Sequence, residues 1–185
     1  MQFLALAGAI VIAAVAVGLA MAFRGGGDNG AANGVDGPCV RQTFPPMGRQ
    51  HVDSVRSGFQ YNSFPPTSGP HYPPGPKAPA VWNVYDSPVD ELALIHNLEH
   101  GGIVVQYGSK VPATTVDELT SFDQQDPNGI VLAPLPRLKG KIALTAWTHL
   151  AECSRFNEKA FTTFRDAFRA KGPEPFPLSA LKPGT

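Results

Sequence analysis

The distribution of apolar positions divides the chain into three parts. Residues 3–23 (FLALAGAIVIAAVAVGLAMAF) are apolar without a single charge. At about 1.5 Å rise per residue, a helix of this length reaches roughly 30 Å, enough to cross a bilayer core. The next stretch is rich in Gly, Asn and Asp, which is typical of a flexible tether. We therefore predict a transmembrane anchor at 1–23, a flexible linker at 24–38 and a folded domain at 39–185.

A cleaved signal peptide is the alternative for the first segment. Ala20 and Ala22 flank a methionine in the small-x-small pattern of a cleavage site. However, no Lys or Arg precedes the apolar run, and the run is long for a signal. These features favour a retained anchor. The flanking charge is too weak to set the orientation by the positive-inside rule.

Proline dominates the first part of the folded domain, between residues 44 and 79. Because proline lacks an amide donor and fixes φ, long helices and central strands are excluded there. Disordered segments are poor in aromatic residues. This region and its flank instead carry several large aromatic residues, among them Phe44, Tyr61, Phe64, Tyr72 and Trp82. An ordered layer of loops is the prediction.

Regular patterns begin after this layer. A helix is predicted from an N-cap at Ser87 to a stop at Gly101, a second at 114–125 with a Thr cap, and a third at 157–172 with one phenylalanine face. Strands are predicted at 103–108, 129–136 and 141–153, the last ending near His149. The fold class is therefore α+β, a small single domain with a short β-sheet, about three helices and a Pro-rich loop layer, preceded by one transmembrane helix.

The two cysteines bear on location. Cys39 and Cys153 both follow the apolar segment, and a pair in an anchored chain is typical of one disulfide outside the cytoplasm. Two free thiols, or thiolate metal ligands, are the alternatives. With the disulfide, the protein is expected in the cell membrane as a single-pass protein with its C-terminal domain extracytoplasmic. The 15 basic residues balance the 15 acidic ones, which gives no support for nucleic-acid binding.

The stretch HNLEHGG carries the main candidate chemistry. His96 and His100 are four residues apart on the first predicted helix, so both imidazoles leave the same face and can bind one metal ion. H-x-x-E-H is also the motif of a class of zinc proteases in which the glutamate is the base. Those enzymes need a distant acidic ligand and a larger scaffold, so Glu99 is a weak candidate for a catalytic base and a stronger one for a supporting carboxylate.

Two more histidines lie in rigid surroundings. His71 follows Gly69 and Pro70, and His149 ends a β-rich run. We expect both to join His96 and His100 in a copper or zinc site, since neutral imidazole suits either metal. His51 is interpreted as a hydrogen-bonded core residue. Met47 is a soft ligand type, but beside two prolines it is more simply explained by loop packing.

Several linked motifs resemble the domain-of-unknown-function 3105 family. They are PPTSGPHY, W-x-x-Y, HNLEHGG-x-V-x-x-Y and the later AW followed by a cysteine segment. The positions that match are Pro65, Pro66, Thr67, Ser68, Gly69, Pro70 and His71, then His96, Asn97, Leu98, Glu99, His100 and Gly101. The resemblance covers the chain from Cys39 to the C-terminal helix. It implies a bacterial protein with one N-terminal membrane segment and one extracytoplasmic domain, and no established activity. The near absence of charge before the apolar segment departs from the family pattern.

The sequence favours a membrane-anchored extracytoplasmic protein that binds a transition metal, copper or zinc, through a histidine cluster. An envelope metal-dependent hydrolase with Glu99 activating water is the second hypothesis. An envelope interaction module, whose histidines only form hydrogen bonds in the core, is the third. The first two share the histidine motif, and a closed or open coordination shell distinguishes them. The sequence identifies no protein partner beyond the membrane itself.

Overall fold

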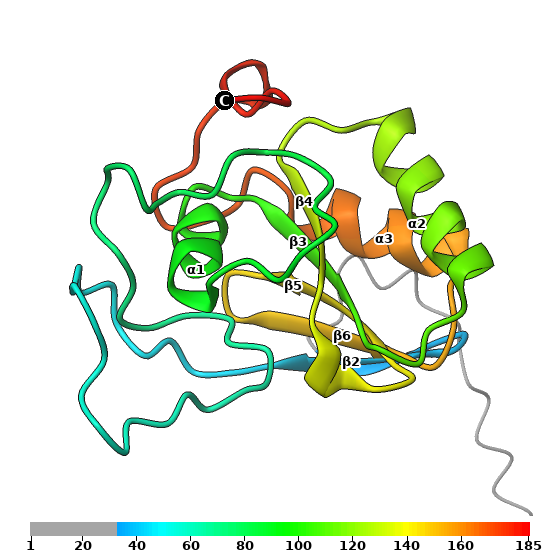
Figure 1. The fold of residues 1–185 in the computed structure, drawn as a ribbon, viewed down its shortest axis with the longest axis horizontal. Helices are drawn as coiled ribbons and strands as arrows, with labels where there is room; N and C mark the ends of the chain where they lie inside the picture. Colours follow the sequence, from blue (N-terminus) through cyan, green and yellow to red (C-terminus); the bar gives the residue numbers. More distant parts are fainter. Residues whose placement is uncertain (1–32) are drawn as a thin grey trace, which may run out of the picture.

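The computed structural model describes residues 33–185 (Figure 1). The predicted anchor and most of the predicted linker lie outside this range. The elements in chain order are β1 (Gly34–Asp36), β2 (Cys39–Thr43), α1 (Glu91–Glu99), β3 (Ile103–Tyr107), α2 (Ala113–Gln125), β4 (Ile130–Pro134), η1 (Pro136–Leu138), β5 (Ile142–Ala146), β6 (His149–Cys153), α3 (Glu158–Phe168) and η2 (Leu178–Ala180). Within 33–185, none of the helices has both the length and the apolar character needed to cross a bilayer. The predicted small α+β domain is confirmed.

One six-stranded sheet forms the centre of the domain, in the order β1-β2-β6-β5-β3-β4. Its neighbouring strands run antiparallel except β3 and β4, which are parallel because α2 returns the chain between them. Cys39 on β2 lies directly opposite Cys153 on β6. These two residues form the predicted disulfide.

The two faces of the sheet have different covers (Figure 1). Strand side chains alternate between the faces, so consecutive apolar residues enter different cores. Helices α2 and α3 cover one face, with a core that includes Ile103, Val105, Leu119, Phe122, Leu132, Leu144, Phe161 and Phe164. Helix α1 packs on the other face, where Leu94 and Leu98 join Val104, Val131 and Trp82. The phenylalanine face predicted for the third helix is thus confirmed.

The Pro-rich segment covers the remainder of the α1 face as ordered loops. Phe44 and Phe64 pack against Leu138, Ala143 and Leu150 there. This segment contains isolated β-bridges but no helix or longer strand. The predicted loop layer is therefore confirmed, and it is held by aromatic anchors rather than by a hydrogen-bonded ladder.

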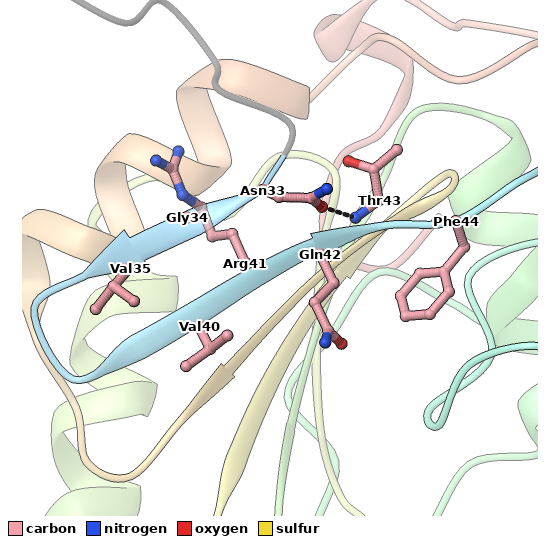
Figure 2. Close-up of a pocket in the computed structure, with 8 residues that line it drawn as sticks. All are labelled: Asn33, Gly34, Val35, Val40, Arg41, Gln42, Thr43 and Phe44. Atoms are coloured by element: carbon pink, nitrogen blue, oxygen red, sulfur yellow. Dashed lines mark hydrogen bonds between the residues drawn. The ribbon is translucent and has the colours of Figure 1, made fainter.

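The sheet starts before the predicted domain boundary at residue 39. Strand β1 lies within the stretch predicted as linker and pairs with β2 at the edge of the sheet. Figure 2 shows this hairpin, with the Asn33 Oδ1 accepting a hydrogen bond from the Thr43 amide at 2.8 Å. Val35 and Val40 remain exposed on it.

Two boundaries differ from the sequence prediction at helix starts. Helix α1 begins at Glu91, because Asp90 rather than Ser87 is the N-cap and accepts a hydrogen bond from the Leu92 amide at 2.9 Å. The Ser87 hydroxyl instead donates to the carboxylate of Asp86. Helix α2 begins at Ala113, where Pro112 is the N-cap and no side chain caps the helix.

The predicted strand at 141–153 is wrong in its continuity. It is a hairpin of β5 and β6, which turns at Trp147 and Thr148. Thr148 adopts a positive φ of 64°. Its amide donates to the Thr67 carbonyl and its carbonyl accepts from the Phe44 amide, both at 2.9 Å. These contacts with the loop layer hold a turn that lacks the usual glycine.

Candidate metal centre

Two histidines of the loop layer are brought together by backbone pairing. His51 and His71 form an isolated parallel β-bridge. The Val52 amide donates to the His71 carbonyl at 2.8 Å, and the His71 amide donates to the Gln50 carbonyl at 3.0 Å. Bridged residues present their side chains on the same side of the backbone. The bridge therefore aims two imidazoles from distant parts of the loop at one place.

Helix α1 supplies the other side of this place. His96 and Glu99 are three residues apart, which puts them on one helix face about a turn from each other. Both are buried, each with only 1% of its surface exposed. The helix thus presents an imidazole and a carboxylate toward the bridged histidines.

Helix α1 ends in hydrogen bonds that fix this face. The Gly102 amide donates to the Asn97 carbonyl at 2.9 Å and the Gly101 amide to the Leu98 carbonyl at 3.0 Å. This is the Schellman arrangement, with Gly101 at a positive φ of 86°. A Cβ on Gly102 would lie 2.4 Å from the Trp82 ring. One glycine therefore permits the turn and the other permits the close approach of Trp82.

Three imidazoles form the centre of the cluster. One ring nitrogen from each of His51, His71 and His96 lies within 4.8 Å of those of the other two. The ring centroids are 5.0 Å apart for His51 and His71, 5.1 Å for His71 and His96, and 5.4 Å for His51 and His96. His71 is fully buried, whereas the His51 side chain is 41% exposed. The cluster therefore lies just under the surface, and His51 is its solvent-facing member.

Backbone carbonyls fix the tautomers of the two buried imidazoles. The His71 Nδ1 lies 2.8 Å from the Gly69 carbonyl and the His96 Nδ1 lies 2.7 Å from the Tyr72 carbonyl. A carbonyl oxygen only accepts, so each Nδ1 carries the hydrogen. In the neutral rings Nε2 then carries the lone pair. Metal-binding histidines in proteins are oriented in this way by hydrogen bonds from the other ring nitrogen.

Burial lowers the pKa of His96, against the opposing effect of its hydrogen bond to the Tyr72 carbonyl. The neighbouring His100 and His71 lower it further, and Glu99 raises it. Because burial is the largest effect, the ring is kept neutral at physiological pH. The neutral ring is the form that coordinates a metal ion.

Glu99 is in direct contact with the imidazoles. Its Oε2 is 2.9 Å from the His71 Nε2 and 3.7 Å from the His51 Nε2. The shorter of these contacts is a hydrogen bond that joins α1 to the loop layer. The sequence predicts a supporting role for Glu99 or, less strongly, that of a base, and both remain predictions.

The predicted ligand set is only partly brought together. His71 and His96 are in the cluster. The His100 ring lies beside that of His96, tilted, with centroids 4.7 Å apart, but its Nδ1 faces the Glu174 carbonyl at 3.3 Å. His149 accepts or donates a hydrogen bond with the Thr43 hydroxyl at 3.0 Å and stacks on Phe168 at 3.9 Å. Burial lowers the pKa of His149, but its contacts are with the sheet edge and α3.

His51 belongs to the cluster, although its sequence context predicts a hydrogen-bonded core residue. The side chain is exposed and joins the cluster through the bridge to His71. No local pattern identifies it, since GRQHV carries no periodic signal. The presence of two histidines, His51 and His71, within the same proline-rich segment is the clue that the sequence offers.

The comparisons with known proteins give a family. The model of a protein family of unknown function, DUF3105, matches residues 51–179. The match begins at His51 and includes all three clustered histidines and Glu99. The searches of curated proteins and of solved structures found no match. Because the matched residues make up most of the chain, the protein belongs to the DUF3105 family.

Proposed function

We propose that this protein binds one transition-metal ion, zinc or copper, through His51, His71 and His96. The observation that carries the proposal is the convergence of three imidazole nitrogens within 4.8 Å, two of them with tautomers set by backbone carbonyls. Neutral imidazole is the commonest protein ligand for both metals. Donor atoms around one such ion lie about 3–4 Å apart, so a small movement of the exposed His51 ring closes the set.

The buried part of the site is already organised for this role. Both carbonyl-bound rings lie at 0–1% exposure and are held by short hydrogen bonds, so little ordering is needed on binding. Binding sites that are ordered in advance lose less affinity to conformational entropy. A surface-facing third ligand provides the path by which an ion arrives and leaves.

The test is metal stoichiometry and affinity of the purified protein with single-histidine variants. His51→Ala removes an exposed ring, so the fold is expected to survive, and the affinity for Zn²⁺ should fall at least about 10-fold. His149→Ala is the matched control, because it removes a histidine whose contacts are with Thr43 and Phe168. Its affinity should equal that of the wild type. Loss of metal in His149→Ala with retention in His51→Ala would instead support the ligand set predicted from sequence.

An envelope metal-dependent hydrolase is the second candidate. It is favoured by the solvent exposure of His51, which places one side of a three-histidine site at the surface where water has access. Three protein ligands and a water are the arrangement of many catalytic zinc sites. Absence of bound zinc or copper after loading of wild-type protein would leave the third reading, in which the histidines only hydrogen-bond in the core.

We further propose that the domain is extracytoplasmic and attached to the cell membrane by residues 1–23. The disulfide supports this, because such bonds persist in oxidising compartments and are rare in the cytoplasm. Because both cysteines are buried in the folded domain, alkylation with a maleimide of high mass after acid quenching of cells and unfolding in detergent tests the redox state. Cys39 and Cys153 should react only after reduction, and the native protein should sediment with the membrane fraction. Free thiols in a soluble fraction would contradict this location.

A further inference from the structure

Glu99 is an unusual residue for the interior. Its carboxylate is 1% exposed. Removing a carboxylate from water is costly unless a cation or several hydrogen-bond donors take the place of the solvent. Among the described residues, the basic groups that approach it within ion-pair distance are the imidazoles of His51 and His71, and no Lys or Arg does so. A positive charge at the centre of the cluster would therefore stabilise the buried Glu99 carboxylate.

The distances from Glu99 to His51 and His71 fit shared coordination. For zinc bonds of about 2.0–2.2 Å, two donor atoms of one four-coordinate ion lie roughly 3–3.6 Å apart. The Glu99 Oε2 lies 2.9 Å from the His71 Nε2 and 3.7 Å from the His51 Nε2. The nitrogen that Glu99 approaches most closely is the one left for a metal by the Gly69 hydrogen bond. The same helix face carries His96 one turn earlier.

We propose that Glu99 is the fourth protein ligand of this site, which makes a closed set of three nitrogens and one oxygen for a divalent ion. This inference rests on the proposed function. Two ligands come from the His51–His71 bridge and two from one face of α1. The carboxylate gives the site a formal negative charge that complements Zn²⁺ or Cu²⁺.

Two consequences for metal choice and chemistry follow. A carboxylate oxygen is a hard donor, whereas Cu⁺ prefers thiolate and thioether sulfur, so the site selects Zn²⁺ or Cu²⁺ over Cu⁺. Four protein ligands fill a tetrahedral shell and leave no position for a water molecule. Closed shells are typical of sites that hold an ion rather than activate water. The set therefore favours metal holding or transfer over hydrolysis.

The test compares wild type, Glu99→Gln and the control Glu174→Gln. Glutamine keeps the size of the side chain but removes its charge and binds metals poorly. Glu174 is half-exposed and pairs with Arg49, close to the site but outside it. Competition with a chelator should show Zn²⁺ affinity lowered more than about 100-fold in Glu99→Gln, beyond the 10–100-fold typical of outer partners. Glu174→Gln should match wild type.

Cobalt substitution reports the coordination directly. Four-coordinate Co²⁺ absorbs visible light strongly, so the wild type should show intense bands that weaken or shift in Glu99→Gln and persist in Glu174→Gln. An unchanged cobalt spectrum in Glu99→Gln would overturn the proposal, even where affinity falls. Failure of wild type to bind any metal would instead reject the proposed function itself.

A second measurement does not require Glu99→Gln, which matters if that variant does not fold. Protein labelled with ¹³C-glutamate should show a shifted carboxylate stretching band in the infrared difference spectrum on addition of Zn²⁺. The control Glu174→Gln should retain that shift. A difference spectrum without any change in the labelled carboxylate bands, at full zinc occupancy, would overturn the assignment of Glu99 as a ligand.

Discussion

At the residue scale, Asp123 carries a carboxyl group that is buried at a cost. It lies on α2 with 6% of its surface exposed, and its Oδ1 has no hydrogen-bond partner in the described part of the chain. Burial raises the pKa of Asp123 to about 6. Because the folded state holds the proton more tightly than the unfolded state, the contribution to stability is full below about pH 4 and is lost as pH rises to about 6.

The raised pKa of Asp123 predicts that removing its charge stabilises the protein above about pH 6. Asp123→Asn removes the charge but keeps the shape, so the free energy of unfolding at pH 7 should rise by about 1–2 kcal/mol. At pH 4 the gain should vanish. Urea denaturation at both pH values measures it, with Asp117→Asn on the exposed face of the same helix as control. Equal effects of Asp123→Asn at the two pH values would contradict the assigned burial cost.

The residues of the candidate site differ in how far the sequence predicts them. His96 is identified by its place in a helical motif, and His71 by the rigid loop around it. His51 is not identified, because its role depends on a backbone bridge to a residue twenty positions away. Such pairing is a tertiary event between two loops with no periodic pattern. His149 and His100 fit the local criteria equally well, yet packing turns them toward Phe168 and Glu174.

At the element scale, the C-terminal end of α1 decides the geometry of the site. A later segment of the chain pairs with it: the Ala170 amide donates to the Gly101 carbonyl at 2.7 Å, and the Glu174 amide to the Glu99 carbonyl at 3.0 Å. These bonds satisfy carbonyls that a helix end leaves without partners. The helix turn that carries Glu99 is thereby held between its own Schellman turn and this segment.

The tightness of this arrangement predicts the effect of a single methyl group. Gly101→Ala places a Cβ 2.8 Å from the Ala170 Cα at a backbone φ of 86°. Strain and overpacking should lower the free energy of unfolding by about 1–3 kcal/mol. The shifted helix end should also weaken Zn²⁺ binding.

Gly140→Ala is the matched control for this substitution. A Cβ at Gly140 meets no atom within 4 Å, so stability should change by less than about 0.5 kcal/mol. Thermal unfolding and zinc titration of both variants check the comparison. If Gly101→Ala and Gly140→Ala behave alike, the packing of segment 170–174 against α1 does not govern the site.

The elements themselves were well predicted where hydrophobic periodicity is strong. The second helix and the strands β3 and β4 lie within two residues of the predicted ranges, whereas the third helix begins one residue later than predicted and ends at Phe168, four residues before the predicted 172. Predicted helix starts were wrong where two residues compete for the N-cap position, as Ser87 and Asp90 do before α1. The turn between β5 and β6 was not predicted, because Thr148 takes a turn conformation that its residue type rarely adopts. Contacts with the loop layer impose this conformation.

At the scale of the whole molecule, the domain joins a regular sheet to a loop layer that has no ladder of its own. Both histidines of the bridge belong to this layer, whereas His96 and Glu99 belong to a helix that packs on the sheet. The site thus lies at the seam between the two parts. Its geometry depends on the loop layer staying fixed against the sheet, which aromatic anchors secure, and on the sheet itself, in which a single covalent link joins β2 to β6.

That link is the disulfide between Cys39 and Cys153, and it predicts how much the whole domain depends on oxidation. The two residues are 114 apart in sequence, so the closed loop contains every candidate ligand. In the chain-entropy model, closing a loop of this length stabilises the folded state by about 4–5 kcal/mol.

The double variant Cys39→Ala/Cys153→Ala should lose about that much free energy of unfolding, measured by urea denaturation against wild type with and without reductant. Because neither sulfur is a ligand, the folded fraction of the variant should still bind zinc at wild-type stoichiometry. A folded double variant without zinc would show that the cysteines belong to the metal site, whereas an unchanged stability would show that pairing of β2 with β6 alone holds the domain closed.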